Sequence, residues 1–537
     1  MSAWLIRKRA ATSLGVLAAL ALLLTFASQI VATTQAAYSW GDGALLELYT
    51  VHASRGFWPF GPYSHFGWHH PGPLLFYLLA PIYTLSGAHA FALNTGAAAI
   101  NVAAAGIVAW AAARWMRPVA GSVMLLLLAA YLWRVSAIAI SYWNPHLLVL
   151  PIGAAVVLCA GVAAGRAALL PLLVFTGSFL AQTHVAMVPT VAALTALAIG
   201  GLFINGDRTP AAPPRRAMFW IGIAAAVALL LWLPPLLEEA AHRPGNVSML
   251  ARFFTEPYPP QPWRVALAAW GDATSSLFAR ALHVPTGAPL EPGTGVAMPL
   301  LAMVQLLLLA AAWHDARRRG DRMHAALALT CIVVSLVALW SIVRVRGQIG
   351  EYMVFWISLT GALSWAAVAA AAIEYVGPGL SRPLIGRHVP AWLAAAVLLA
   401  FTAAATRHLA DHVRQPEAAS RRIATLSDAA LTYLRTSGAA HPSLRLSPAV
   451  WPEGAGVVVR LYKLGIAASV KPDQVSFFGT PLAPDGREDV ALYIVDAAGH
   501  AERTTHADDL LLAQEGAIYL HAAPLPGAQA TSGPEGH

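Results

Sequence analysis

The chain has 537 residues, of which 58% are hydrophobic and 11% are charged, and its apolar residues occur in runs of about twenty. This composition excludes a soluble globular protein and predicts an α-helical polytopic membrane protein. The formal net charge of +8 does not indicate a nucleic-acid partner, because the basic residues cluster in short loops between the apolar runs.

Eleven apolar runs are long enough to cross a membrane. They lie near 11–33, 90–113, 118–137, 145–164, 168–186, 187–204, 217–236, 296–313, 323–343, 351–373 and 389–405. The first run follows a basic flank and is too long for the core of a signal peptide, so we expect a retained span that enters from the cytoplasm. We therefore expect residues 1–405 to form the transmembrane domain.

Basic loops set the expected orientation. With a cytoplasmic N-terminus, the loops that hold Arg114, Arg208 and the arginines at 317–319 all face the cytoplasm, as the positive-inside rule requires. A further apolar run at 73–87 would reverse the later loops if it crossed the membrane, so we predict a juxtamembrane helix there. The outer face then receives loops 34–89 and 237–295 and the tail after 405.

The tail, residues 406–537, changes in composition. Four segments look like short strands around a helix, which predicts a small α/β extracytoplasmic domain with a disordered end. These segments are 441–450, 456–470, 489–499 and 515–523.

The first outer loop gathers polar and aromatic residues next to the membrane. Asp42 is followed by Glu47 within GDGALLELY, and the local sequence is compatible with a helix N-cap followed by a solvated glutamate. The alternative is a carboxylate base at the membrane surface. The histidines at 65, 69 and 70 follow in a loop rich in glycine and proline, where hydrogen bonding at an interface is favoured over a metal site.

Other polar residues lie at the outer ends of two further spans. Tyr142, Asn144 and His146 precede or begin the fourth span, and Gln182 and His184 end the fifth. Polar side chains at the ends of several spans predict a shared cavity.

The outer loop between spans nine and ten breaks the charge rule. It carries Arg344 and Arg346, shortly before Tyr352. Guanidinium groups at the level of the headgroups bind phosphates well, which predicts a site for a lipid phosphate. The alternative is a pair of arginines that only anchors lipid headgroups.

Together these features resemble the GT-C superfamily of membrane glycosyltransferases, which includes protein O-mannosyltransferases and aminoarabinose transferases. The resemblance depends on the acidic GDGALLELY after span one, the HPGPLLFYLLAPIYTLSG run, the large outer loop after span seven and the outer tail. It implies an inverting transfer of a sugar from a polyprenyl phosphate, with Asp42 as the base. The second acid that the family has beside this base is replaced by Gly43, and the second outer loop has YWNPH where many members have an aspartate. The resemblance therefore implies no certain cofactor and leaves a divalent metal possible.

The resemblance further implies a bacterial inner (cytoplasmic) membrane location with the site on the extracytoplasmic face. The expected partners are a polyprenyl-phosphate-linked sugar, membrane lipids and a glycan, lipid or protein acceptor. Arg344, Arg346 and Tyr352 are expected to bind the donor phosphate. Substrate binding is expected of Glu47, Tyr63, His65, His69, His70, Tyr142, Asn144, His146, Gln182 and His184. The competing hypothesis is a transporter or flippase of lipid-linked saccharides, although such proteins usually place ionisable or helix-breaking residues near mid-membrane.

Overall fold

The computed structural model describes residues 38–205, 215–279, 284–285, 287–291, 293, 295–376, 389–414 and 418–525. The expected first span and the expected disordered end lie outside the described residues. The described chain forms two compact units. The helical unit contains His70–Leu75 and Asn94–Ala410, and the mixed unit contains residues 38–69, Phe76–Leu93 and 411–525.

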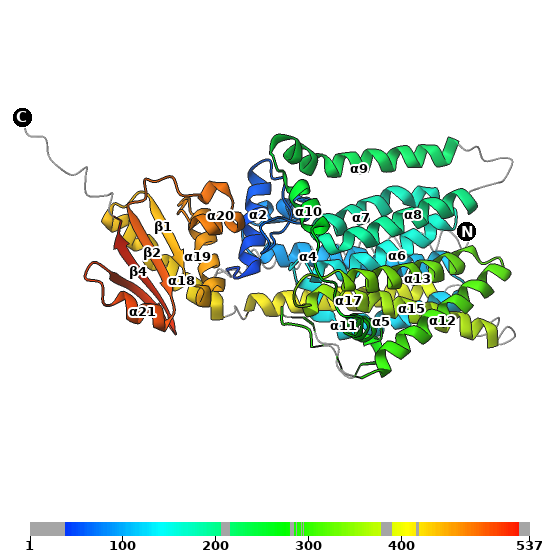
Figure 1. Cartoon of the computed structure of the whole chain (residues 1–537). Helices are drawn as coiled ribbons and strands as arrows, with labels where there is room; N and C mark the ends of the chain where they lie inside the picture. Colours follow the sequence, from blue (N-terminus) through cyan, green and yellow to red (C-terminus); the bar gives the residue numbers. More distant parts are fainter. Residues whose placement is uncertain are drawn as a thin grey trace, which may run out of the picture. The chain divides into compact units, whose positions relative to one another are not determined.

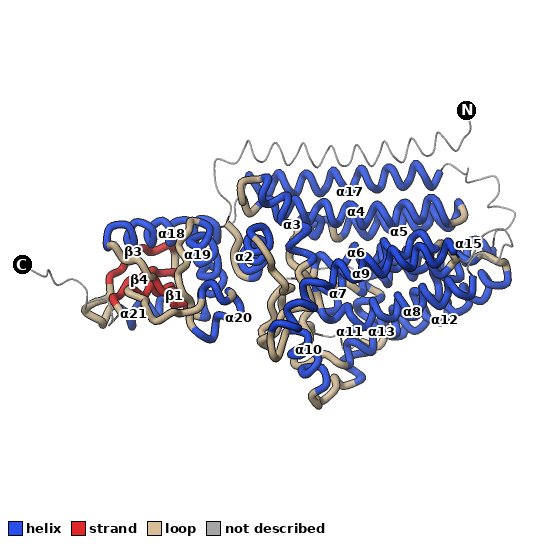
Figure 2. The backbone as a smooth tube through the Cα atoms, turned by 90° about the horizontal axis from the view of Figure 1, so that it is seen from above, coloured by secondary structure: helices blue, strands red, loops and turns tan. Residues whose placement is uncertain are grey.

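Long apolar helices run side by side in the helical unit (Figure 2). Among the described residues, eight helices are long and apolar enough to cross a membrane, and three apolar helices are shorter. The long ones are α4 (Phe91–Trp115), η2 with α6 (His146–Leu148, Val149–Ala163), η4 with α8 (Val185–Met187, Val188–Asn205), α9 (Arg215–Ala241), α12 (Ala297–Arg318), α13 (Arg322–Val343), α14 with α15 (Glu351–Val354, Ile357–Val376) and α17 (Val389–Arg414). The shorter ones are α3 (Leu74–Leu85), α5 (Pro118–Arg134) and η3 with α7 (Ala167–Leu169, Leu170–Thr183).

These helices confirm the predicted polytopic helical fold. Each of the expected spans after the first coincides with an apolar helix, and α3 occupies the run at 73–87. Two shorter elements, α10 (Asn246–Thr255) and α11 (Trp263–Thr274), follow α9.

Helix α6 forms the centre of the helical unit. Every residue of VLPIGAAVVLCAGVA is buried, as its uniformly apolar sequence requires. By contrast, α9 is equally apolar but leaves Met218, Phe219 and Leu230 exposed. An apolar helix with exposed large side chains suits contact with lipid.

Small residues let these helices approach closely. Gly361 of α15 lies against the end of α11, where an added Cβ would be 2.1 Å from the carbonyl oxygen of Thr274. Only glycine fits such a contact between two backbones.

We therefore predict that Gly361→Ala destabilises the helical unit by about 1–3 kcal/mol, the usual cost of overpacking. Thermal unfolding in detergent should show a melting temperature lower by several degrees. Gly200→Ala in α8 is the matched control, because nothing lies within 4 Å of a Cβ at that position. Equal melting temperatures for the two variants would contradict the prediction.

The mixed unit contains a four-stranded sheet in the order β1-β2-β4-β3 (Figure 1). Strand β1 (Pro442–Leu446) is parallel to β2 (Val490–Val495), whereas β4 (Ile518–Pro524) is antiparallel to both β2 and β3 (Leu510–Glu515). Its helices are α2 (Asp42–Arg55), α18 (Ala418–Ser437), α19 (Trp451–Lys463), α20 (Val475–Phe478) and α21 (Ala497–Arg503). We call residues 418–525 the C-terminal domain.

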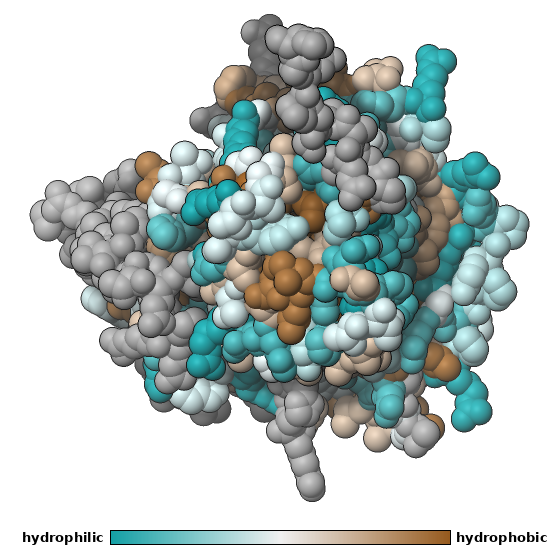
Figure 3. Space-filling view, turned by 90° about the vertical axis from the view of Figure 1, so that its left-hand side faces the viewer, coloured by the Kyte–Doolittle hydropathy of each residue, from teal (hydrophilic) through white to brown (hydrophobic). Residues whose placement is uncertain are grey.

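The structure confirms the predicted small α/β domain and corrects one segment. Residues 456–470 were expected to be a strand, but most of α19 lies there. Pro452 and Glu453 suit a first helical turn, and Val457, Val458 and Leu461 form one buried face. Burial of this face outweighs the β-propensity of the valines. Figure 3 shows one face of the molecule, on which hydrophilic residues surround a smaller hydrophobic patch.

Candidate functional site

Asp42 is the first residue of helix α2 in the mixed unit. Gly41, not Asp42, is the N-cap, and its φ of 55° lies in the left-handed region that favours glycine. Asp42 lies in the first turn, where the helix dipole stabilises a carboxylate. The hydroxyl of Tyr63 donates a hydrogen bond to its Oδ1 atom at 2.5 Å. Asp42 is therefore held as an oriented acceptor at the helix end.

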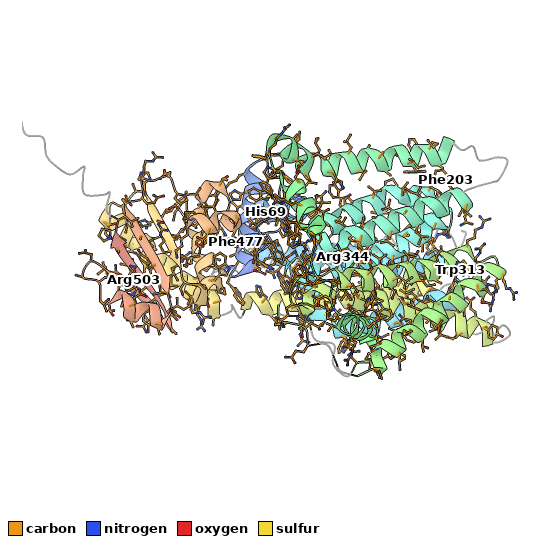
Figure 4. The ribbon with its side chains drawn as sticks, in the orientation of Figure 1. His69, Phe203, Trp313, Arg344, Phe477 and Arg503 are labelled. Carbon is orange, nitrogen blue, oxygen red and sulfur yellow. The ribbon has the colours of Figure 1, made fainter. Side chains whose placement is uncertain are left out.

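Tyr63 is itself fixed on two sides. Its ring meets Phe477 of the C-terminal domain edge to face, with 5.3 Å between centroids, and its backbone forms a bridge with His69. The ring of His69 lies against Tyr49, and its Nδ1 is 3.2 Å from the carbonyl oxygen of Gly61 (Figure 4). These contacts hold Tyr63 in place beside the carboxylate of Asp42.

The three histidines of the first loop take different positions. His65 is exposed and stacks on Phe66, whereas His69 packs in the mixed unit and His70 belongs to the helical unit. Within the described ranges, no group of three or more histidine, cysteine or acidic residues could hold a metal ion.

Of the two alternatives for helix α2, a solvated Glu47 is the one that the structure contradicts. The residue is 2% exposed. Its Oε1 accepts a hydrogen bond from the hydroxyl of Tyr83 at 2.7 Å. The same oxygen forms an ion pair with Nζ of Lys463 at 2.5 Å. The burial of this carboxylate is compensated by Lys463 of α19, a residue that sequence analysis did not single out.

In the helical unit, the His-Pro-Gly-Pro turn is tied to the end of α7. The side chain of Gln182 accepts from the N–H of Leu74 at 3.2 Å and donates to the carbonyl of Leu231 at 2.9 Å. Gly72 is required here, because an added Cβ would lie 2.5 Å from Oε1 of Gln182. Gln182 therefore fixes the path of this turn.

His70 and His184 complete the same connection. Nδ1 of His70 accepts from the N–H of Val185 at 3.2 Å, and Nδ1 of His184 accepts from the N–H of Ala186 at 3.2 Å. The two rings lie 4.3 Å apart. Both imidazoles thus hold the backbone between α7 and α8.

The polar residues before α6 also hold backbone groups. Asn144 donates to the carbonyl of Thr183 at 3.3 Å, which joins this segment to the end of α7. His146 lies between the hydroxyl of Ser141 at 2.8 Å and the carbonyl of Pro285 at 2.9 Å.

Two aromatic residues from separate loops meet beside this segment. Trp143 packs against Tyr352 with 5.4 Å between ring centroids. The neighbouring Tyr142 is partly buried. Tyr352 therefore lies near the segment that begins α6.

A cleft in the helical unit contains both predicted phosphate ligands. Its lining residues are Phe254, Tyr258, Pro259, Pro260, Arg344 and Arg346. Arg344 is exposed, and within the described part of the chain its side chain makes no hydrogen bond or ion pair. No acidic side chain lines the cleft. The guanidinium of Arg344 is available to an anion (Figure 4).

Arg346 is more constrained than Arg344. Its guanidinium lies 4.1 Å from the ring centroid of Phe253 and donates to the carbonyl of Glu256 at 2.6 Å. The side chain of Gln261 donates to the carbonyls of Val345 and Gly347, at 3.0 and 2.6 Å. The loop is thus pre-formed around the cleft. Sequence analysis missed its aromatic and proline wall, although the FFTEPYPPQPW run was a visible signal.

The sequence-predicted residues divide between the two units. Asp42, Glu47, Tyr63, His65 and His69 belong to the mixed unit. The helical unit holds His70, Tyr142, Asn144, His146, Gln182, His184, Arg344, Arg346 and Tyr352.

Comparison with known proteins establishes the fold. No protein-family model and no curated protein matches the sequence. Among solved structures, the chain is similar to ArnT from Cupriavidus metallidurans bound to undecaprenyl phosphate, with a TM-score of 0.55 and 13% identity over 95% of this chain and 98% of that chain. The chain has the fold of ArnT. The apo state of ArnT gives a TM-score of 0.50 at 14% identity, over 96% of this chain and 98% of that one.

This likeness to ArnT confirms the predicted fold of a polytopic helical protein with a small C-terminal α/β domain. It extends over almost the full length of both chains, so the membrane helices and the C-terminal domain both have counterparts in ArnT. At this identity the likeness concerns the fold alone, and the roles of individual residues follow from the site described above.

Buried histidines make the mixed unit sensitive to acid. Burial lowers the pKa of His52 and of His69 to about 4, with Arg55 adding to the effect at His52. Both rings are neutral in the folded protein and take up a proton on unfolding below an unfolded pKa of about 6.5. The unfolded state therefore binds more protons between pH 6.5 and pH 4, and stability falls as the pH is lowered through this window.

We predict that the melting temperature drops between pH 6.5 and pH 4. The free energy of unfolding should fall over this window by up to about 1.4 kcal/mol per pH unit for each histidine. Scanning fluorimetry in detergent measures this. The double variant His52→Phe/His69→Phe should show a flatter dependence, whereas the exposed His65→Gln should behave like wild type. Equal slopes in all three proteins would contradict the assignment.

Proposed function

We propose that the chain is a glycosyltransferase that moves a sugar from a polyprenyl-phosphate donor to an acceptor at the outer face of the membrane. The observation that carries this proposal is the cleft with Arg344, whose side chain has no partner among the described residues, and the neighbouring Arg346. The cleft occurs on a chain with the fold of ArnT, whose structure was determined with undecaprenyl phosphate bound. The outer-face assignment is supported by the basic loops expected in the cytoplasm.

The lipid phosphate is the leaving group of this reaction. A guanidinium binds phosphate oxygens through charge-assisted hydrogen bonds, and it stabilises the charge that develops as the bond between sugar and phosphate breaks. One well-placed donor contributes about 3 kcal/mol to such stabilisation. Phe254 and Tyr258 line the same cleft. Tyr352, which packs against Trp143, is the third proposed phosphate ligand.

Asp42 is the proposed base. Its carboxylate would accept the proton of the acceptor hydroxyl, while Tyr63 keeps it oriented through the bond to Oδ1. Direct displacement by the acceptor oxygen at the anomeric carbon inverts the configuration of the sugar. No step in this scheme needs a metal ion, and a divalent cation could still assist at the phosphate.

One prediction of this proposal concerns the donor phosphate. Arg344→Gln removes a guanidinium that has no intramolecular partner among the described residues, so folding should be unchanged. The dissociation constant of the lipid donor should rise by about tenfold or more, the value of one charged hydrogen bond. Titration of the donor into protein in nanodiscs measures this.

The matched control is Arg252→Gln. Arg252 is also exposed and close in sequence to the cleft wall, but it pairs with Glu256 and does not line the cleft. An unchanged donor affinity in Arg344→Gln would reduce Arg344 to a headgroup anchor.

The second prediction concerns the base. Asp42→Asn keeps an oxygen that can accept from Tyr63 but removes the basicity, so turnover should fall by about 10²-fold or more. Donor affinity should remain within twofold of wild type. Asp473→Asn is the control, because Asp473 is an exposed acid in the first turn of another helix of the same unit. Wild-type turnover in Asp42→Asn would rule out this mechanism.

A further inference from the structure

The segment that leads into α2 is bound to the C-terminal domain. The N–H of Gly41 donates to the carbonyl of Pro452 at 2.9 Å. Tyr38 and Ser420 exchange two hydrogen bonds, at 3.2 and 3.1 Å. Gly456 of α19 lies so close that an added Cβ would be 2.7 Å from the carbonyl oxygen of Ser39. The backbone just before Asp42 therefore follows the surface of α18 and α19.

A buried ion pair makes the second connection. The side chain of Glu47 is 3% exposed and that of Lys463 is 21% exposed, with 2.5 Å between their charged atoms. Lys463 also lies 5.5 Å from the ring centroid of Tyr83, whose hydroxyl donates to the same carboxylate oxygen. A buried carboxylate depends on such compensation, because it has lost its hydration.

A third connection lies on another side of the helix. The hydroxyl of Tyr49 donates to the carbonyl of Phe477, and the ring of Phe477 meets Tyr63, the partner of Asp42. In a helix of 3.6 residues per turn, Glu47 points about 140° away from Asp42, whereas Tyr49 lies within about 20° of it. Contacts on opposite sides fix the rotation of α2 about its axis.

We propose that the C-terminal domain positions the helix that carries Asp42, and that Lys463 is the positioning residue, acting through Glu47. This inference depends on the proposed role of Asp42 as the base. In this proposal Glu47, which the sequence predicted to bind substrate, sets the orientation of α2 through its contact with Lys463. Lys463 contacts Glu47 and Tyr83, and its proposed effect on Asp42 is transmitted through α2. The domain is therefore part of the catalytic apparatus and not an independent appendage.

The test measures the order of α2 directly. Hydrogen exchange of residues 42–55, followed by mass spectrometry, is compared in the full-length protein and in the variants Lys463→Met, Glu47→Gln and their double mutant. We expect exchange in this segment at least tenfold faster in all three variants. The double mutant should be no worse than the worse single variant, because both single changes remove the same contact.

Arg422→Met is the matched control. Arg422 forms an ion pair of 2.7 Å with Glu453, which joins α18 to α19 without involving α2. In Arg422→Met, the hydrogen exchange of residues 42–55 should equal that of wild type. Lys463→Arg keeps the charge and should restore slow exchange, which separates loss of the contact from general misfolding.

Sugar transfer provides the second readout. Turnover should fall by tenfold or more in Lys463→Met, with the KM for the donor within twofold of wild type, and should recover in Lys463→Arg. Unchanged exchange in residues 42–55, or equal acceleration in Arg422→Met, would overturn the positioning role. Absence of sugar transfer in the wild-type protein would instead overturn the proposed function, and the exchange result would still stand.

Discussion

The arrangement of the mixed unit depends on one buried contact, between Glu47 of α2 and Lys463 of α19. The two residues are 416 positions apart in the chain, yet their charged atoms are 2.5 Å apart. Since the carboxylate of Glu47 is buried, the ion pair favours the orientation of α2 that keeps the two charges together. That orientation in turn directs Asp42 towards Tyr63 at the start of the helix.

In the helical unit, most predicted polar residues bind backbone groups. Gln182, His146 and Asn144, for example, hold backbone groups of the loops between helices. Because backbone groups at the edge of a membrane need partners, such side chains stabilise the loops. Arg344 differs, since it is exposed and unpaired within the described ranges. This contrast separates a residue available to a ligand from residues committed to the fold.

Sequence alone predicted the fold well because its signals are local. Apolar runs and basic loops defined the helices. Strands β1 and β2 lie inside predicted segments, and β4 extends one residue beyond its segment. The valines of α19 misled because the burial that selects a helix comes from tertiary contacts. The burial of Glu47 could not be foreseen, since its partner Lys463 lies in a distant segment with no recognisable motif. The cleft residues at 344 and 346 were predictable because their charge contradicts the orientation rule.

The central claim is that the chain cleaves the bond between sugar and lipid phosphate, and one measurement tests it most directly. Purified protein in vesicles receives a polyprenyl-phosphate sugar labelled in the sugar, and the label is followed by extraction and chromatography. The account predicts that free polyprenyl phosphate accumulates in step with a labelled acceptor, and that the sugar in the product has inverted configuration. Movement of the intact donor across the bilayer without cleavage would contradict the account and identify a flippase.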